Sequence, residues 1–373
     1  MRIGIDARFL GDDGGIARYV KRLVENLERI DHENEYVIFL RLKNWEEYHP
    51  SNPHFTKQLA DIPWYGFKEQ LLMPFVVRRA RVDLMHFPHW NIPLLYRGSF
   101  VVTIHDLILL HFPSKRASTR SRLTYFFKYT CYRALLKKAT RASKHIIAPS
   151  EFTKHDIVRT LHVPPEKITV TYEGVDAPNA NITPERAAVV LNTFGIQKPY
   201  VLYVGVAYPH KNLEWFIEAV STYNTQHATK LQTVLVGAHN YFYERIKHEN
   251  AGLIRDSLLV LTGFVSDSDI PALFKHASVY VFPSLYEGFG LPPLQACAYG
   301  TPILSSNKTS MPEILGNAAL YFDPSDTMDF HNKLEMIMQD KKIRIELIQN
   351  GLKRYQQFSW VTMAKMCLPI YKK

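Results

Sequence analysis

One segment of the chain, residues 283–306, brings together a carboxylate, two glycines and the start of a helix. Its sequence, PSLYEGFGLPPLQACAYGTPILSS, follows an apolar run typical of a strand and leads into a helix near Pro292. Gly288 and Gly290 let the backbone approach a ligand closely, and a helix start offers free N–H groups and the positive end of its dipole. Together, these features predict a cradle for an anionic or hydroxyl-rich ligand. A plain glycine turn explains the two glycines equally well on physical grounds.

The same segment resembles the signature of the retaining glycosyltransferases of family 4, which have the GT-B fold. That signature is a glutamate, seven residues and a second glutamate, and Glu287 matches the first position. Other matching stretches follow in the family's order along nearly the whole chain: Asp6 and Arg8 followed by GGIARY, SEFTKHDI from Ser150, EGVD at 173–176, YVGVAYPHKNL at 203–213, LTGFVSDSDI at 261–270, PEILGNAALYFDP and a late FSW. The resemblance implies transfer of a sugar from a nucleotide diphosphate sugar.

The resemblance also implies roles for matching residues in the second half of the chain. Glu287 is expected to contact hydroxyls of the transferred sugar, and Lys211 is expected to neutralise the donor diphosphate. Further donor contacts are expected from the loop and helix start that follow the glutamate, namely Gly288, Phe289, Gly290 and Leu291. The backbone of Gly263, Phe264 and Val265 is expected to read the nucleotide base.

Three positions depart from the family pattern. The second acidic position, which grips the ribose hydroxyls in the family, is Gln295, whose amide can form hydrogen bonds without charge assistance. His210 is a predicted donor contact where this subgroup usually has arginine, so the cationic grip is expected to be reduced. Ala17 stands where the family often has glycine. We expect weakened nucleotide binding, not inactivity.

In the first half, the resemblance assigns donor contacts to a glycine loop and a histidine. Gly14 and Gly15 match the loop that lies near the diphosphate and the acceptor. His105, at a strand end in VVTIHDL, matches a histidine that contacts the donor sugar, with Asp106 supporting the loop. An isolated histidine at such a place is more often structural, so that alternative stays open.

Short apolar runs alternate with amphipathic stretches in both halves, as is typical of parallel sheets covered by helices on both faces. The runs lie at 2–6, 36–40, 83–87, 100–104, 145–149 and 168–172, and then at 200–206, 233–237, 258–263, 279–282, 301–306 and 319–322. With the resemblance, they predict an α/β protein of GT-B architecture, in which two Rossmann-like parallel-sheet domains face a cleft. We place the N-terminal acceptor domain at 1–178, the nucleotide-sugar domain at 179–358, and a C-terminal helix that returns to the first domain at 359–373.

All the excess positive charge of the chain lies in residues 107–150. Ten lysines and arginines fall there without a single acidic residue, which leaves 35 basic and 35 acidic residues elsewhere. A segment whose charged residues are all positive predicts an anionic partner, and we expect a membrane surface or a phosphate-bearing acceptor. A solvated face of one long helix over 118–144 would also explain it. We predict no nucleic-acid partner, because no known binding module matches.

The residues that could hold a metal ion do not form a ligand set in the sequence. Asp267 and Asp269 look like a DXD metal motif but are better placed to cap a helix. His86 and His89 have no third ligand nearby, and the three cysteines lie far apart. We predict no metal and no cofactor.

The resemblance, together with these observations, implies a retaining, metal-independent hexosyltransferase in which Glu287, Lys211 and His105 are catalytic. The donor is expected to be a GDP- or UDP-linked sugar, mannose first, and the acceptor a glycan or a lipid-linked glycan. Two alternatives remain: a sugar-nucleotide epimerase on the same fold, and a basic nucleic-acid-binding protein. No apolar run approaches the roughly 18 residues of a membrane span, and the early Asp6 argues against a secretion signal. We therefore expect a cytoplasmic protein at the inner face of the membrane.

Overall fold

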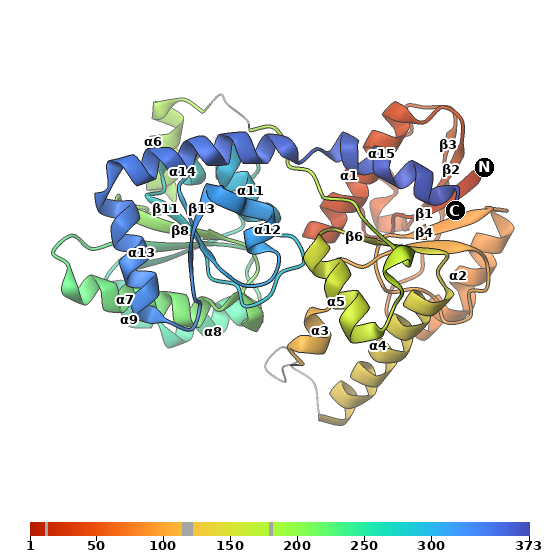
Figure 1. Cartoon of the computed structure of the whole chain (residues 1–373), viewed down its shortest axis with the longest axis horizontal. Helices are drawn as coiled ribbons and strands as arrows, with labels where there is room; N and C mark the ends of the chain where they lie inside the picture. Colours follow the sequence, from red (N-terminus) through yellow and green to blue (C-terminus); the bar gives the residue numbers. More distant parts are fainter. Residues whose placement is uncertain (12–13, 114–121, 179–181) are drawn as a thin grey trace. The chain divides into compact units, whose positions relative to one another are not determined.

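The computed structural model describes residues 1–11, 14–113, 122–178 and 182–373, which divide into two compact units (Figure 1). Unit 1 comprises Met1–Leu107, Ser118–Gly174 and Ser359–Lys373, and unit 2 comprises Ile108–Ala117 and Val175–Phe358. The sequence predicted boundaries after residues 178 and 358 and assigned 108–117 to the first domain, whereas the described part of that segment, 108–113, groups with unit 2.

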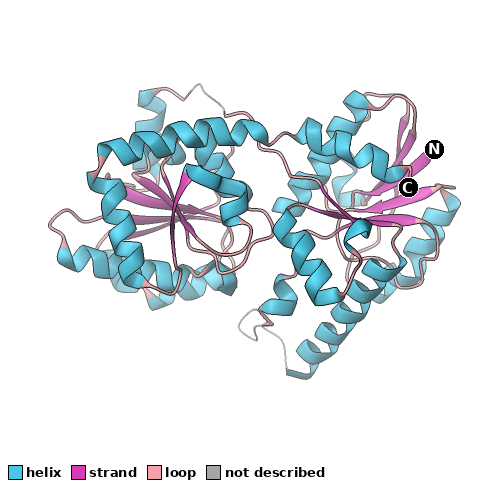
Figure 2. Cartoon of the chain, in the orientation of Figure 1, coloured by secondary structure: helices cyan, strands magenta, loops and turns pink. Residues whose placement is uncertain are grey.

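Unit 1 is built on a seven-stranded sheet in which all neighbouring strands are parallel (Figure 2). The strand order is β3-β2-β1-β4-β5-β6-β7. The strands are β1 (Arg2–Asp6), β2 (Glu35–Leu40), β3 (Phe55–Leu59), β4 (Leu84–Phe87), β5 (Phe100–Thr103), β6 (His145–Ala148) and β7 (Ile168–Val170). Most are buried along their length, since helices cover both faces, but the edge strand β3 is largely exposed or half-buried. The helices of this unit are α1 (Gly15–Ile30), α2 (Phe67–Arg79), α4 (Arg122–Ala142), α5 (Glu151–Leu161) and α15 (Trp360–Tyr371), with the 3-10 turns η1 (Leu42–Glu47) and η3 (Pro165–Lys167).

Helix α15 completes the core of unit 1 although it follows all of unit 2 in the chain. It packs against α1, and the Tyr371 hydroxyl lies 2.8 Å from Nδ1 of His86 in β4. The backbone of Gly174 approaches α15 so closely that an added Cβ would lie 2.2 Å from the Trp360 nitrogen. The predicted return of the C-terminal helix is confirmed. The long helix predicted over 118–144 is α4 in the described part, and 118–121 lie outside it.

Unit 2 has a six-stranded parallel sheet of order β10-β9-β8-β11-β12-β13. Its strands are β8 (Tyr200–Val204), β9 (Gln232–Val236), β10 (Leu259–Gly263), β11 (Val279–Phe282), β12 (Ile303–Ser306) and β13 (Ala319–Phe322). Its helices are α3 (Ile108–His111), α6 (Pro184–Thr193), α7 (Leu213–Gln226), α8 (Tyr241–Glu249), α9 (Ala251–Arg255), α10 (Ile270–His276), α11 (Leu291–Ala298), α12 (Met311–Leu315), α13 (Thr327–Gln339) and α14 (Lys341–Arg354), with the 3-10 turns η4 (Pro209–Lys211), η5 (Gly316–Ala318) and η6 (Tyr355–Gln357). The prediction of two Rossmann-like parallel sheets is confirmed.

The strand order of unit 2 reverses between β8 and β11, because the chain builds the sheet outward from β8 and then returns to start again beside it. In open parallel sheets, loops that leave the carboxyl ends of two such strands diverge and form a ligand crevice. The residues after β8 and β11 are therefore where chemistry is expected. Within the described ranges, no helix has both the length and the apolar character needed to cross a bilayer.

Candidate active site

Lys211 and Glu287 meet at the point where the strand order of unit 2 reverses. Lys211 ends η4 in the loop after β8, and Glu287 lies in the loop after β11. The Lys211 Nζ donates to Oε1 of Glu287 at 2.6 Å, and the two side chains are only 15% and 9% exposed. A cation and a carboxylate thus face each other in a largely desolvated place, where charge interactions are stronger than in water.

The loop that carries Lys211 is held by hydrogen bonds on both sides of that residue. The Leu285 N–H donates to the His210 carbonyl oxygen at 2.8 Å, which ties the two loops together. Asn212 adopts a left-handed conformation at φ 60°, and its amide donates to the Pro324 carbonyl oxygen at 3.0 Å. These bonds fix the direction in which the lysine leaves the backbone.

The loop that carries Glu287 is held by two hydroxyl side chains that the sequence reasoning missed. The Glu287 N–H donates to the Thr309 hydroxyl at 3.0 Å, and the buried Ser310 hydroxyl lies 3.0 Å from the carbonyl oxygen of Glu287 and 3.2 Å from that of Phe289. The only sequence signal for these residues was their place in KTSMPEIL, next to a stretch that matched the family pattern. They position the loop from outside the motif.

The glycine turn and the helix start differ from the predicted cradle in one respect. Gly290 has φ 102°, and an added Cβ would lie 2.5 Å from Cε of Met311, so this position requires glycine. Helix α11 then begins with Leu291, followed by Pro292 and Pro293, which have no N–H. The predicted set of free N–H groups is therefore reduced, and the backbone donors here are those of Gly290 and Leu291.

His210 does not supply the positive charge that arginine would. Burial, and then the neighbouring Lys211 charge, lower its pKa to about 4. Its ring stacks beside Tyr208 at a centroid distance of 5.9 Å. The imidazole is therefore neutral near pH 7, and Lys211 is left as the cation of this loop.

The predicted nucleotide contacts lie at the end of β10, just after it, and on α11. Gln295 is half-buried in α11, and its side chain makes no hydrogen bond to another residue in the described part of the chain. Gly263 ends β10 at φ 71°, where an added Cβ would lie 2.9 Å from Nε2 of His239. The next residue, Phe264, is 70% exposed, whereas Val265 is buried. An exposed aromatic ring beside a tight glycine could stack on a base, in addition to the predicted backbone contacts.

Gly14 and Gly15 lie at the start of α1 in unit 1. Gly14 has φ 115° and ψ 177°, which side chains rarely adopt, and Gly15 is the first helical residue. An added Cβ at either glycine would meet no described atom within 4 Å. The N-terminus of α1 is thus open on this side, while Ala17 is buried in the helix.

His105 has both ring nitrogens engaged inside unit 1. Nδ1 lies 3.1 Å from Oε1 of Glu173, Nε2 lies 2.9 Å from the Pro88 carbonyl oxygen, and the ring meets Tyr19 edge-on. Burial opposes a charge on this ring, but the hydrogen bond and charge of Glu173 outweigh it and raise its pKa. Both ring nitrogens thus have protein partners. The ring must give up one of these two hydrogen bonds before it can bind a sugar hydroxyl.

His86 and His89 are buried side chains of unit 1. His86 hydrogen-bonds to Thr103 and Tyr371 through its two ring nitrogens, and burial lowers the pKa of both histidines to about 3.

The predicted capping role of the Asp267–Asp269 cluster is wrong. Asp269 precedes α10 without a side-chain cap and pairs instead with Arg186, because this oppositely charged side chain of α6 lies within reach. Among the described residues, no group of three His, Cys, Asp or Glu side chains could hold a metal ion.

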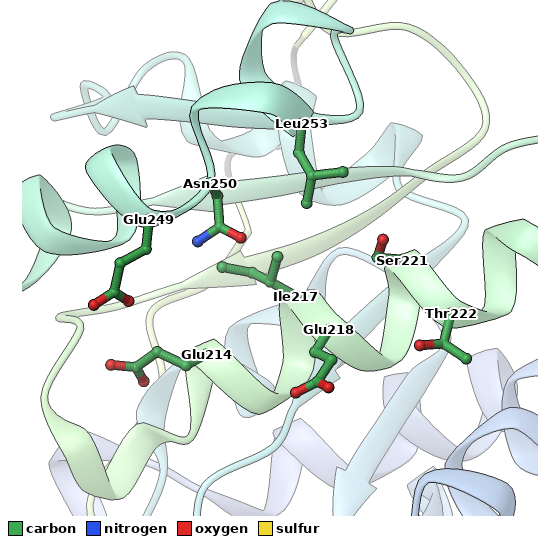
Figure 3. A pocket seen from close by; sticks show the side chains of 8 residues that line it. All are labelled: Glu214, Ile217, Glu218, Ser221, Thr222, Glu249, Asn250 and Leu253. Carbon is green, nitrogen blue, oxygen red and sulfur yellow. The ribbon is translucent and has the colours of Figure 1, made fainter.

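A hollow of about 360 Å³ lies elsewhere on unit 2, between α7 and the pair α8 and α9 (Figure 3). It is lined by Glu214, Ile217, Glu218, Ser221, Thr222, Glu249, Asn250 and Leu253. Two of its carboxylates, on Glu214 and Glu249, already pair with Arg245. No predicted site residue lines it, so it is separate from the site at β8 and β11.

Each of the two units matches a family model of known proteins. Residues 13–178 match the family model described as Glycosyltransferase Family 4, and residues 192–354 match the model described as Glycosyl transferases group 1. The chain is 28% identical to O-antigen chain mannosyltransferase B of Escherichia coli, over 80% of this chain and 76% of that protein. It is 26% identical to O-antigen chain mannosyltransferase RfbU of Salmonella typhimurium, over 78% of this chain and 74% of that protein. The solved structure of Anabaena HepE in complex with UDP-glucose superimposes with a TM-score of 0.76 at 17% identity, covering 100% of this chain and 99% of that one. The predicted GT-B architecture is confirmed.

Proposed function

The chain belongs to glycosyltransferase family 4, and we propose that it transfers mannose with retention of configuration from a nucleotide diphosphate sugar to a glycan or lipid-linked glycan. The observation that carries this proposal is the Lys211–Glu287 pair at the strand-order reversal of unit 2. A donor bound there would meet one cation and one carboxylate side by side.

The two side chains would act on different parts of the donor. Charge develops on the diphosphate as the glycosidic bond breaks, and a fixed ammonium group stabilises that charge in the transition state. Lys211 would supply it, with the N–H groups of Gly290 and Leu291. Glu287 would accept hydrogen bonds from hydroxyls of the sugar, an interaction that orients the anomeric carbon. The hydrogen bonds that Glu287 makes through its N–H to Thr309 and through its carbonyl oxygen with Ser310 support this role, because they fix the loop before the donor arrives.

We propose front-face displacement, in which the departing diphosphate stays beside the anomeric carbon and helps to remove the proton of the incoming hydroxyl. No residue is assigned as a covalent nucleophile, and neither a metal ion nor a cofactor is assigned a step. In unit 1, Gly14, Gly15 and His105 remain proposed donor contacts. The engaged ring nitrogens of His105 favour a part in which the ring is held in place and not one in which it exchanges protons.

Mannose is proposed because O-antigen mannosyltransferases are among the relatives, and a GDP- or UDP-linked donor remains open because HepE binds UDP-glucose. We propose a cytoplasmic place at the inner face of the membrane, with residues 107–150 attracting an anionic partner. No nucleic-acid partner is proposed.

The test is a thermal-shift screen of the full chain against GDP-mannose, UDP-glucose and the free nucleoside diphosphates, followed by transfer to lipid extracts. Stabilisation by one nucleotide sugar is expected, with a product whose anomeric configuration, read by NMR, equals that of the donor. An inverted product would overturn retention. Conversion of the nucleotide sugar without any acceptor would establish the epimerase instead, and a chain that no nucleotide sugar stabilises would overturn the proposal.

A further inference from the structure

Helix α2 of unit 1 presents a row of large apolar side chains to solvent. Phe67, Leu71 and Phe75 are 81%, 65% and 65% exposed, and Leu72 beside them is 48% exposed. Residues spaced four apart lie along one side of a helix, so the first three form a continuous row. The opposite side of α2 faces the core through Glu69, Met73 and Val77, which are buried. The helix is therefore fully packed on one face while its other face is apolar and uncovered.

The exposed apolar surface continues onto a neighbouring loop. Leu94 and Leu95 are 40% and 55% exposed. The Leu94 N–H donates to Oε1 of Gln70 at 2.5 Å, and this bond holds the loop beside α2. We call these six side chains the apolar patch: Phe67, Leu71, Leu72, Phe75, Leu94 and Leu95. Scattered apolar residues on a surface are ordinary, but a contiguous group of this kind marks a place of interaction.

The apolar patch is framed by positive charge. The outer side of α2 also carries Lys68, Arg78 and Arg79, all exposed. The one acidic residue between 62 and 82 is Glu69, which is turned inward and lies 2.6 Å from Arg8. At the loop that carries Leu94, the Lys138 ammonium of α4 donates to the carbonyl oxygens of Leu94 and Tyr96. Residues 84–105 contain no acidic residue at all.

We propose that α2 and the loop at Leu94–Leu95 dock unit 1 onto an anionic lipid bilayer, with the apolar patch among the acyl chains near the surface. Lys68, Arg78 and Arg79 then lie at the level of the lipid phosphates. Apolar side chains flanked by lysine and arginine are the arrangement of helices that lie in a membrane interface. The 13 residues of α2 rise about 20 Å, too short to span the roughly 30 Å core. A second copy of the chain is a poorer partner, because symmetric pairing of this face would bring like charges together.

This inference moves the membrane contact predicted for 107–150. Helix α4 still contributes exposed basic side chains, such as Arg133 and Lys137, but the residues that would enter the lipid lie on α2 and its neighbouring loop. The inference rests on the proposed function in one respect: the purpose of the docking would be to hold the enzyme at a surface that carries a lipid-linked acceptor. The docking itself depends on the patch alone.

Vesicle co-sedimentation of the full chain tests the inference. Vesicles of phosphatidylethanolamine and phosphatidylglycerol are compared with phosphatidylcholine vesicles at low and high salt. We expect binding to the anionic vesicles that weakens with salt. Phe67→Ser/Phe75→Ser should weaken it at least about tenfold, since each ring loses its apolar burial. Arg78→Gln/Arg79→Gln should weaken binding to the anionic vesicles roughly fivefold for each charge removed at low salt.

A matched control separates the patch from apolar exposure in general. Leu42→Ser/Met328→Ser removes two side chains that are 67% and 63% exposed outside the patch, and it should bind vesicles like the unmodified chain. All variants should keep the same melting temperature and the same stabilisation by the nucleotide sugar, because none of these side chains is buried.

Three outcomes would overturn the docking. They are equal binding to both kinds of vesicle, unchanged binding by Phe67→Ser/Phe75→Ser, and a concentration-dependent dimer that this variant dissolves, which would assign the patch to a second copy. Vesicle binding without any sugar transfer would leave the docking in place and count against the proposed function alone.

Discussion

Replacing Lys211 by methionine separates what the Lys211–Glu287 pair does for the fold from what it does for the reaction. Methionine keeps an unbranched side chain of similar length and removes the charge, so the Glu287 carboxylate, which is 9% exposed, loses its partner at 2.6 Å. Breaking a buried pair in this way costs about 3–5 kcal/mol, and the partial exposure of Lys211 argues for the lower end. A loss of about 3 kcal/mol lowers the melting temperature of a unit of this size by roughly 6–12 °C.

The effect on the reaction should be separate and larger. If the ammonium group stabilises the leaving diphosphate, its loss lowers turnover roughly 10²–10³-fold, which corresponds to about 3–4 kcal/mol. Nucleotide affinity should fall less than turnover, because the charge on the diphosphate grows as the bond breaks. Release of nucleoside diphosphate from the donor gives the turnover, and calorimetry gives the affinity.

The double variant Lys211→Met/Glu287→Gln provides the decisive comparison. With no unpaired carboxylate left, it should regain most of the lost stability but none of the turnover. Arg186→Met, which breaks the more exposed pair with Asp269 in the same unit, should cost under about 1 kcal/mol and leave turnover unchanged. Near-normal turnover in Lys211→Met, or recovery of turnover in the double variant, would refute the catalytic assignment and leave the pair a structural one.

Further predictions concern the nucleotide contact, the glycine turn and the histidine of unit 1. Gln295→Glu should tighten binding of the nucleoside diphosphate about fivefold in calorimetry, because a charged acceptor gains roughly 1 kcal/mol over a neutral one; equal or weaker binding would mean that Gln295 does not face the ribose. Gly290→Ala should lower the free energy of unfolding by about 1–3 kcal/mol, since alanine resists φ 102° and its Cβ would collide with Met311; an unchanged denaturant midpoint would contradict this. The raised pKa of His105 means that its charged form stabilises the fold at acidic pH and that this contribution is lost as the pH rises through the raised value. Glu173→Gln should therefore be less stable than the unmodified chain at pH 6, and the difference should shrink as the pH rises; a difference that stays constant would rule out this linkage.

The strands that could be predicted from the sequence are those that are buried and therefore consist mostly of apolar residues. Continuous apolar runs marked six strands of unit 1 and all six of unit 2, because most residues of those strands are buried. Strand β3, FTKQL, was missed, since an edge strand that is mostly exposed or half-buried needs no apolar run.

The site residues that the sequence predicts lie in local motifs, whereas a contact between two loops leaves no such motif. Lys211 and Glu287 were found through the stretches that carry them. Thr309 and Ser310, which follow β12, act on the backbone of the loop after the adjacent strand β11, and no spacing within their own segment shows that. Asp269 was expected to cap its own helix, but a nearby arginine from α6 competes for its carboxylate.

The position of α15 has a consequence for how the protein is made. Unit 1 needs Trp360, Cys367 and Tyr371 in its core, yet the ribosome delivers them only after every residue of unit 2. Until then, the surface of α1 that α15 covers is bare, and Nδ1 of His86 lacks the Tyr371 hydroxyl. Unit 1 therefore stays incomplete during synthesis until unit 2 has been made. A chain that ended before residue 359 would contain all of unit 2 but would lack part of the core of unit 1.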